Sequence, residues 1–243
     1  WAARYAQRCQ KVQVDTSTHI PTPTQKYLLQ SLHYRIVKEE AEILQEDYTD
    51  LWREKPGDIH VEEPLLRLVH GLPGAGKSQV LIWIKQYLEE VWQWQANNQF
   101  AIVAPQNEMA NNVGGVTIHS FGGIAFKDRR GIVVNARGSL DNEKQSLQSR
   151  QWHNLRVLLF DEIEAAGVDL VGQVEDKMKL HVPLQNGLVQ GLQHIQHADR
   201  VCRRAFAGVN TLFFGDFWQL DPTGSKSFMS NPYDMTGDPH VLK

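Results

Sequence analysis

Residues 71–78 read Gly-Leu-Pro-Gly-Ala-Gly-Lys-Ser and fit the phosphate-loop pattern Gly-x4-Gly-Lys-Ser at every fixed position. A triphosphate needs several backbone N–H donors around its oxygens, and a glycine-rich turn lets the backbone come that close. In this pattern Lys77 reaches the β- and γ-phosphates and the Ser78 hydroxyl binds Mg²⁺. The loop therefore predicts a nucleoside triphosphate site, and the small residues expected to line it are Gly71, Gly74, Ala75 and Gly76.

The segments on either side supply the context that a phosphate loop requires. Residues 65–69 form a short apolar run, which is typical of a buried strand. After Ser78, apolar residues recur at helical spacing as far as Trp94, so the loop leads into an amphipathic helix whose positive end faces the anion. A chance glycine-rich turn would not be expected to have this order of strand, turn and helix.

Bulk composition excludes several classes of protein. The net charge of −3 does not indicate nonspecific binding of polyanions, so any nucleic-acid contact must come from a local patch. No apolar stretch approaches the ~20 residues of a membrane span. Cys9 and Cys202 form no disulfide framework, which favours a reducing, intracellular compartment. Because the chain begins at Trp1 and not at methionine, we expect it to be a fragment of a longer protein.

The rest of the chain alternates helical and strand patterns. After a polar segment over residues 1–20, a helix is expected from Thr24, as its cap, to Leu44, followed by a charged connector over 46–63. Residues 127–141 are expected to form a surface loop. Near-continuous apolar runs predict three more strands, at 100–104, 155–160 and 210–214. The alternation predicts a doubly wound α/β fold with a parallel sheet, helices on both faces and ligands at the carboxyl ends of the strands.

Two of these strands end in polar residues that suit a nucleotide site. Asp161 and Glu162 follow the third strand, where the first carboxylate can hold Mg²⁺ and the second can orient or deprotonate a water molecule. Gln219 follows the fourth strand and is a neutral donor for a γ-phosphate. Residue type alone favours a surface turn in which the Gln219 amide has satisfied hydrogen bonds.

Residues 114–121, Gly-Gly-Val-Thr-Ile-His-Ser-Phe, form a glycine turn that leads into polar and aromatic side chains. His119 can contact a phosphate and Phe121 can stack on a base, although a lone histidine is more often structural. A zinc site at His194 and His197 is disfavoured because no further ligands accompany them. The basic pairs 129–130 and 203–204 are more often solvated surface than DNA contacts, and most of the seven tryptophans are expected in core or interface positions.

Taken in order, four elements resemble the petite-integration-frequency (PIF) family of superfamily-1 DNA helicases. They are residues 71–78, residues 114–121, Asp161-Glu162-Ile163, and Gly215-Asp216-Phe217-x-Gln219-Leu220-x-Pro222. The resemblance runs from about Pro21 to Pro232. It implies an ATP-driven, Mg²⁺-dependent enzyme that moves five-prime to three-prime on single-stranded DNA and unwinds duplex junctions, in DNA repair, recombination or telomere maintenance. A nuclear or mitochondrial location would follow in a eukaryote.

The resemblance also implies roles for individual residues. Gln25 matches the glutamine that reads adenine, and Lys77 and Ser78 match the phosphate and magnesium residues. Asp161 and Glu162 match the magnesium-binding and water-activating pair, and Gln219 matches the γ-phosphate sensor. The residues that match the element touching single-stranded DNA are Thr117, His119, Ser120 and Phe121.

Some positions depart from the family pattern. The family usually has Thr near Gln106, Ser-Met where Glu164-Ala165 stand, and a second proline in place of Asp221. Residues 21–243 are expected to form one RecA-like P-loop ATPase domain, the first motor domain, with no candidate for the second. An alternative is a nucleotide-binding module without motor activity, either a degenerate or a regulatory copy. A phosphate-loop small-molecule kinase is a third reading, but it does not explain residues 215–220.

Overall fold

The computed structural model describes residues 20–44, 55–60, 63–124, 126–127, 133–134, 152–181, 204–219, 222, 225–228 and 230. Several sequence predictions lie outside these residues. They include nearly all of the segment 1–20, most of the connector 46–63 and of the loop 127–141, and the side chains of Cys9, Arg129, Arg130, His194, His197, Cys202, Arg203 and Asp221.

The centre of the molecule is a five-stranded sheet in which every neighbouring pair of strands is parallel. The strand order is β1-β7-β6-β2-β3. The bounds are β1 Leu66–His70, β2 Phe100–Ala104, β3 Val116–Thr117, β6 Val157–Phe160 and β7 Asn210–Gly215. The parallel sheet confirms the predicted α/β class. Four of the strands were expected from their apolar runs, whereas β3 has only two residues and gives no such pattern.

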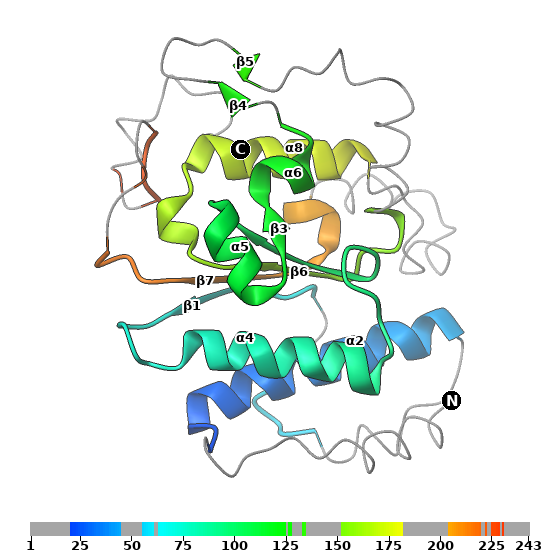
Figure 1. Ribbon diagram of the computed structural model, residues 1–243. Coiled ribbons are helices and arrows are strands. Elements are labelled where there is room, and N and C mark those ends of the chain that lie inside the picture. Colours follow the sequence, from blue (N-terminus) through cyan, green and yellow to red (C-terminus); the bar gives the residue numbers. More distant parts are fainter. Residues whose placement is uncertain are drawn as a thin grey trace.

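Helices cover both faces of this sheet, as Figure 1 shows. Below the sheet in that view lie α2 (Pro23–Leu44) and α4 (Lys77–Gln86), and above it lie α6 (Ile118–Gly122) and α8 (Val168–His181). Because side chains alternate along a strand, each inner strand supplies both layers. In β2, for example, Phe100 and Ile102 pack with α2 and α4, whereas Ala101 and Val103 pack with α6 and α8.

Shorter elements complete the described part of the chain. The helix after the phosphate loop ends earlier than predicted: α4 passes into a π-helical turn, η1 (Tyr87–Val91), which stops before Trp92. The others are α5 Asn107–Val113, η2 Ile163–Ala165, η3 Ala205–Gly208, and the antiparallel pair β4 Phe126–Lys127 and β5 Val133–Val134. Among the helices described, none is both long and apolar enough to cross a membrane.

Strand β1 is not buried, in contrast to the sequence prediction. It lies at the edge of the sheet, and its only partner among the described strands is β7. Leu66 and Leu68 are 49% and 55% exposed. Their side chains lie on the opposite face of the sheet from Val69, which packs against the layer of α2 and α4. The apolar run predicted the strand correctly, but it could not indicate that one edge of β1 pairs with none of the other described strands.

The first turn of α2 is closed by Thr22 and not by Thr24, which corrects the predicted cap. The backbone N–H of Gln25 donates to the Thr22 hydroxyl at 3.4 Å, and the backbone N–H of Thr22 donates to Gln25 Oε1 at 2.9 Å. This reciprocal pair is a capping box. Pro23 takes the first helical position, where its missing N–H costs nothing.

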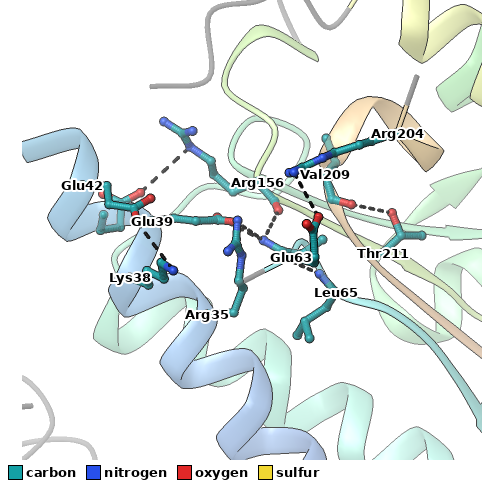
Figure 2. A network of polar contacts seen from close by, with 12 residues as sticks. Arg35, Lys38, Glu39, Glu42, Glu63, Leu65, Arg156, Arg204, Val209 and Thr211 are labelled. Carbon is teal, nitrogen blue, oxygen red and sulfur yellow. Dashed lines mark hydrogen bonds and ion pairs between the residues drawn. The ribbon is translucent and has the colours of Figure 1, made fainter. Parts of the chain in front are cut away.

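A buried polar network fixes α2 to the amino ends of the strands (Figure 2). Arg35 and Glu39 form an ion pair of 2.7 Å whose side chains are 0% and 3% exposed. The Asn210 amide donates to both Glu39 oxygens at 2.9 and 3.0 Å, and its carbonyl accepts from the Leu65 N–H at 2.9 Å. Burial raises the pKa of Glu39, and the nearby Arg35 opposes that rise. The network therefore joins α2 to the amino ends of β1 and β7, at the opposite ends of these strands from the phosphate loop.

Candidate nucleotide and DNA site

The phosphate loop has the backbone that its glycines predict. Gly74 and Gly76 have φ of 79° and 83°, a left-handed conformation that glycine adopts without the strain of a side chain. Gly76 also precedes α4, so the loop delivers the chain directly to the amino end of that helix. A Cβ atom added at Gly76 would lie 2.8 Å from Gln25 Nε2. The left-handed backbone therefore favours glycine at this position, and a side chain here would also displace the Gln25 amide.

Lys77 and Ser78 open α4, where the free N–H groups and the helix dipole favour an anion. The Lys77 ammonium donates to the backbone carbonyls of Gly71 and Leu72 and thus lies over the loop itself. Ser78 is exposed. The sequence placed both residues correctly at the first turn of the helix.

Asp161 and Glu162 follow β6 at the same carboxyl edge of the sheet. The Asp161 N–H donates to the Val103 carbonyl at 2.8 Å, which fixes the end of the strand against β2. Asp161 is only 7% exposed, and this burial, with the neighbouring Glu162 carboxylate, raises the pKa of Asp161 to about 6. The Lys77 charge acts on the same carboxyl group and lowers its pKa in part. Lys77 of the phosphate loop and the Asp161 carboxyl group are therefore electrostatically coupled.

Gln219 lies in a turn that follows β7, the strand between β1 and β6. The buried carboxylate of Asp216 organises this turn, because it accepts from the Trp218 N–H at 3.1 Å and from Gln219 Nε2 at 3.3 Å. The sequence pointed to Gln219 but not to Asp216 as the residue that holds it. The signal that could have identified Asp216 is its residue type, because an Asp side chain often accepts hydrogen bonds from groups two or three positions later in a turn.

Gln25 reaches the same loop from a distant part of the sequence. Its Nε2 donates to the Ala75 carbonyl at 3.3 Å, while its Oε1 belongs to the cap of α2. The structure thus places Gln25, Lys77, Asp161 and Gln219 at the carboxyl edge of the sheet. The role of Gln25 as an adenine reader stays a prediction.

The donor set of this edge suits magnesium with a triphosphate. Such a site needs one hydroxyl and one carboxylate from the protein, because phosphate oxygens and water complete the octahedron. Ser78 offers a hydroxyl and Asp161 a carboxylate at this edge of the sheet. Among the described residues, no cluster of three or more His, Cys, Asp or Glu side chains is arranged to hold a metal ion alone.

The predicted DNA element lies two strands away from β6 on the same edge. Gly114 ends α5 with a φ of 66°, and β3 then pairs beside β2, so that Thr117 stands opposite Ala104. The Thr117 hydroxyl accepts from the Ser120 N–H at 3.1 Å and caps α6. At the other end of α6, Lys177 of α8 donates to the carbonyls of Gly122 and Gly123 at 2.8 and 2.9 Å. The element is therefore held at both ends.

The four predicted DNA-contacting residues differ in exposure. Ser120 is exposed and Thr117 is half-buried. Burial lowers the pKa of His119, against the influence of Asp169 on α8. The ring of Phe121 packs at 5.4 Å from that of Trp152, next to the core beneath α6 and α8. Ser120 is thus the most accessible of the four residues. Thr117, which caps α6, and Phe121, which packs on Trp152, also stabilise the fold.

Comparison with known proteins gives relatives of one kind. No protein-family model matches the chain. Over 152 residues, 63% of this chain and 15% of the relative, the chain is 29% identical to the ATP-dependent DNA helicase PIF1 of Saccharomyces cerevisiae (strain YJM789). Over 156 residues, 64% of this chain and 20% of the relative, it is 27% identical to the ATP-dependent DNA helicase Pif1 of Psychrobacter sp. (strain PRwf-1). The chain therefore spans no more than a fifth of the length of either protein.

Solved Pif1 helicases give matches of the same kind. The crystal structure of the Pif1 helicase from Candida albicans matches with a TM-score of 0.48 and 21% identity, over 84% of this chain and 34% of that one. A Bacteroides Pif1 helicase, solved in complex with ADP-AlF3 and ssDNA, matches with a TM-score of 0.42 and 24% identity, over 68% of this chain and 31% of that one. The sequence matches to the curated helicases confirm the resemblance: the chain is similar to part of these Pif1 helicases.

Proposed function

We propose that this chain binds ATP with Mg²⁺ and hydrolyses it as the first motor domain of an ATP-dependent DNA helicase. The observation that carries this proposal is the position of Lys77, at the start of α4, and Asp161, directly after β6, at one edge of the sheet, where the charge of Lys77 lowers the pKa of Asp161 in part. The relatives to which the chain is similar in sequence are named ATP-dependent DNA helicases.

Each residue of the site then has a defined task. Lys77 exchanges its two loop carbonyls for phosphate oxygens, which form stronger charge-assisted hydrogen bonds. Ser78 and Asp161 hold the magnesium ion, which neutralises phosphate charge when bound. Glu162 takes a proton from the attacking water. Gln219, held by Asp216, donates to the γ-phosphate, and Gln25 contacts the adenine base.

DNA contacts extend the proposal to the second element. Single-stranded DNA would lie along α6, where Thr117, His119, Ser120 and Phe121 contact its phosphates and bases. Movement from five-prime to three-prime, opening of duplex junctions, and a place in repair, recombination or telomere maintenance belong to the same proposal. So does a nuclear or mitochondrial location in a eukaryote, where such a motor meets its DNA.

Loss of the loop lysine tests the nucleotide site. Lys77→Ala is expected to weaken Mg²⁺-ATP binding about 10- to 150-fold, because a charge-assisted hydrogen bond contributes about 1.5–3 kcal/mol. Calorimetric titration of the purified chain measures this. Lys179→Ala is the matched control, since it removes the same charge from a 2.6 Å surface pair with Glu175 on α8. Equal affinity for ATP in both variants would reject the site. Binding without turnover would favour a nucleotide-binding module that lacks motor activity.

A charge placed on α6 tests the DNA element. Ser120 is exposed, so Ser120→Glu is expected to leave the fold intact and to repel DNA phosphates, with at least a severalfold loss of affinity that shrinks as salt rises. Fluorescence anisotropy with a labelled single-stranded oligonucleotide measures it. Leu44→Glu adds the same charge to the exposed end of α2 in the other helical layer and should have no comparable effect. Identical affinities for DNA would return residues 117–121 to a purely structural role.

A further inference from the structure

Helix α6, which carries three of the four predicted DNA-contacting residues, is too short to hold its own position. It spans only Ile118–Gly122, and isolated helices shorter than about 12–15 residues are marginal in water. Its orientation must therefore come from contacts with other elements. At its first turn, the side chain of Thr117 caps the helix from β3. At its last turn, the contact comes from α8.

Lys177 of α8 holds the last turn of α6. Its ammonium donates to the Gly122 carbonyl at 2.8 Å and to the Gly123 carbonyl at 2.9 Å. A cation at the carboxyl end of a helix is favourable, because the last carbonyl groups lack donors within the helix and carry partial negative charge. Lys177 is half-buried and forms no ion pair with a carboxylate among the described residues. Its charge is therefore directed at the end of α6.

Close packing brings α6 and α8 together at the same place. A Cβ atom added at Gly122 would lie 3.0 Å from Val174 Cγ2, so the end of α6 lies directly against α8 in the upper layer of Figure 1. Val174 and Met178 stand three residues before Lys177 and one after it, and both are fully buried. Lys177 therefore reaches α6 from a helix whose own position is set by the core.

We propose that Lys177 is a positioning residue for DNA binding: it fixes the end of α6 to α8 and so holds Ser120 and His119 in the orientation in which they meet the strand. The proposal rests on the proposed contact between single-stranded DNA and α6. In this role Lys177 does not touch DNA, because the two carbonyls engage its ammonium. Without the ammonium, those carbonyls need water as their donor, and the last turn of α6 separates from α8.

DNA affinity in Lys177→Met tests this role, with Lys179→Met as the matched control. Both variants replace a lysine of α8 by an uncharged side chain, but Lys179 forms a surface pair with Glu175. Fluorescence anisotropy with a labelled single-stranded oligonucleotide is expected to show about a tenfold loss of affinity in Lys177→Met alone. Lys177→Arg keeps a charged donor for the two carbonyls and should restore affinity to within about twofold of wild type.

The salt dependence of binding separates positioning from direct contact. Loss of one phosphate contact reduces the slope of log affinity against log salt by about 0.7 for single-stranded DNA. Lys177→Met is expected to shift this line and to keep its slope, because the cation that it removes does not meet a phosphate. A slope reduced by about 0.7 would assign Lys177 to the DNA interface and overturn the positioning role.

A glycine variant tests the same contact without changing any charge. Gly122→Ala places a methyl group against Val174 and pushes α6 away from α8. It is expected to weaken DNA binding severalfold and to leave Mg²⁺-ATP affinity as in wild type, because the phosphate loop lies between β1 and α4. If Lys177→Met does not fold, Gly122→Ala decides the question, and wild-type DNA affinity in it would overturn the role.

The outcomes distinguish this role from the proposed function. If wild type binds single-stranded DNA and Lys177→Met binds it equally well, the positioning role is wrong and the proposed DNA element stands. If wild type binds no single-stranded DNA, the proposed DNA element fails and the positioning role fails with it. Equal losses of DNA and Mg²⁺-ATP affinity in Lys177→Met would mean that Lys177 stabilises the whole domain, which also overturns a specific role in DNA binding.

Discussion

Glu162, the proposed acceptor of a proton from water, has an unusual backbone conformation. Its φ of 51° and ψ of 46° are left-handed, a conformation that few residues other than glycine adopt and that costs of order 1 kcal/mol or more. The turn is maintained because the Ala165 N–H donates to the Glu162 carbonyl at 3.1 Å and the Ala166 N–H donates to the Ile163 carbonyl at 3.0 Å. The side chain of Glu162 is therefore placed by a fixed turn and not by a flexible loop.

Glu162→Gln is expected to bind Mg²⁺-ATP as wild type does and to lose about 10²–10⁴-fold in turnover. The amide keeps the shape of the side chain but cannot take a proton from water. Steady-state phosphate release and calorimetric titration measure the two properties separately. Glu175→Gln on α8 is a control of equal chemistry outside the site. Turnover that does not change in Glu162→Gln would reduce this residue to a turn former.

At this scale the sequence predicted local motifs well and tertiary partners poorly. Lys77 and Asp161 were found because each belongs to a short pattern with a physical reason. Asp216 was not recognised as the partner of Gln219, because its role depends on how one turn folds back on itself. Glu164 was noted only as a departure, since nothing in sequence indicates that Gly215 would lie against it.

The side chain of Gln25 joins helix α2 to the phosphate loop. Gln25 accepts from Thr22 in the capping box and donates to Ala75 in the loop. Farther along α2, the buried Glu39 carboxylate accepts two hydrogen bonds from the Asn210 amide of β7 and so holds the helix to the sheet. Helix α2 therefore connects the carboxyl ends of the strands, where the phosphate loop lies, to their amino ends.

Thr22→Ala is expected to lower the free energy of unfolding by about 0.5–2 kcal/mol, the usual cost of removing a helix cap. Urea unfolding followed by circular dichroism measures it. Thr24→Ala is the matched control, because Thr24 is exposed within the first turn and should tolerate alanine with little change. Equal unfolding free energies for the two variants would mean that the hydroxyl of Thr22 does not cap α2.

Element prediction succeeded where the pattern is long and failed where neighbours decide. Strand β2 was predicted at its observed bounds and α2 within one residue. Strand β3 was missed, because two residues pair with β2 without any alternation of their own. The exposure of β1 was predicted wrongly, because the order of strands in a sheet is set by packing and not by the composition of one strand.

Buried acidic groups gather at the carboxyl edge of the sheet, where the protein is expected to bind Mg²⁺ together with the negatively charged triphosphate. Asp161 and Glu164 are buried and both have raised pKa values. A carboxyl group whose pKa is higher in the folded than in the unfolded protein favours folding at low pH and loses that contribution as pH rises through the folded pKa. The arrangement that suits the proposed reaction thus opposes stability in the absence of ligand.

Asp161→Asn is expected to be more stable than wild type at pH ~8, by up to about 3 kcal/mol, since each pKa unit corresponds to about 1.4 kcal/mol. The advantage should shrink as pH falls through about 6, the pKa of Asp161, and vanish near its ordinary value of 3.8. Thermal unfolding without metal or nucleotide measures it. A difference that stays constant with pH would show that Asp161 is not held at a raised pKa.

Strand β1, at one edge of the described sheet, exposes two leucine side chains. Leu66 and Leu68 lie on β1, whose outer edge pairs with no other described strand. Such an edge is a template on which another polypeptide can add a strand. In a test tube, the most abundant polypeptide is another copy of the same molecule. The concentration at which the purified chain is stored will therefore decide how long it stays dispersed, and a lysine introduced along that edge is the simplest means of keeping it so.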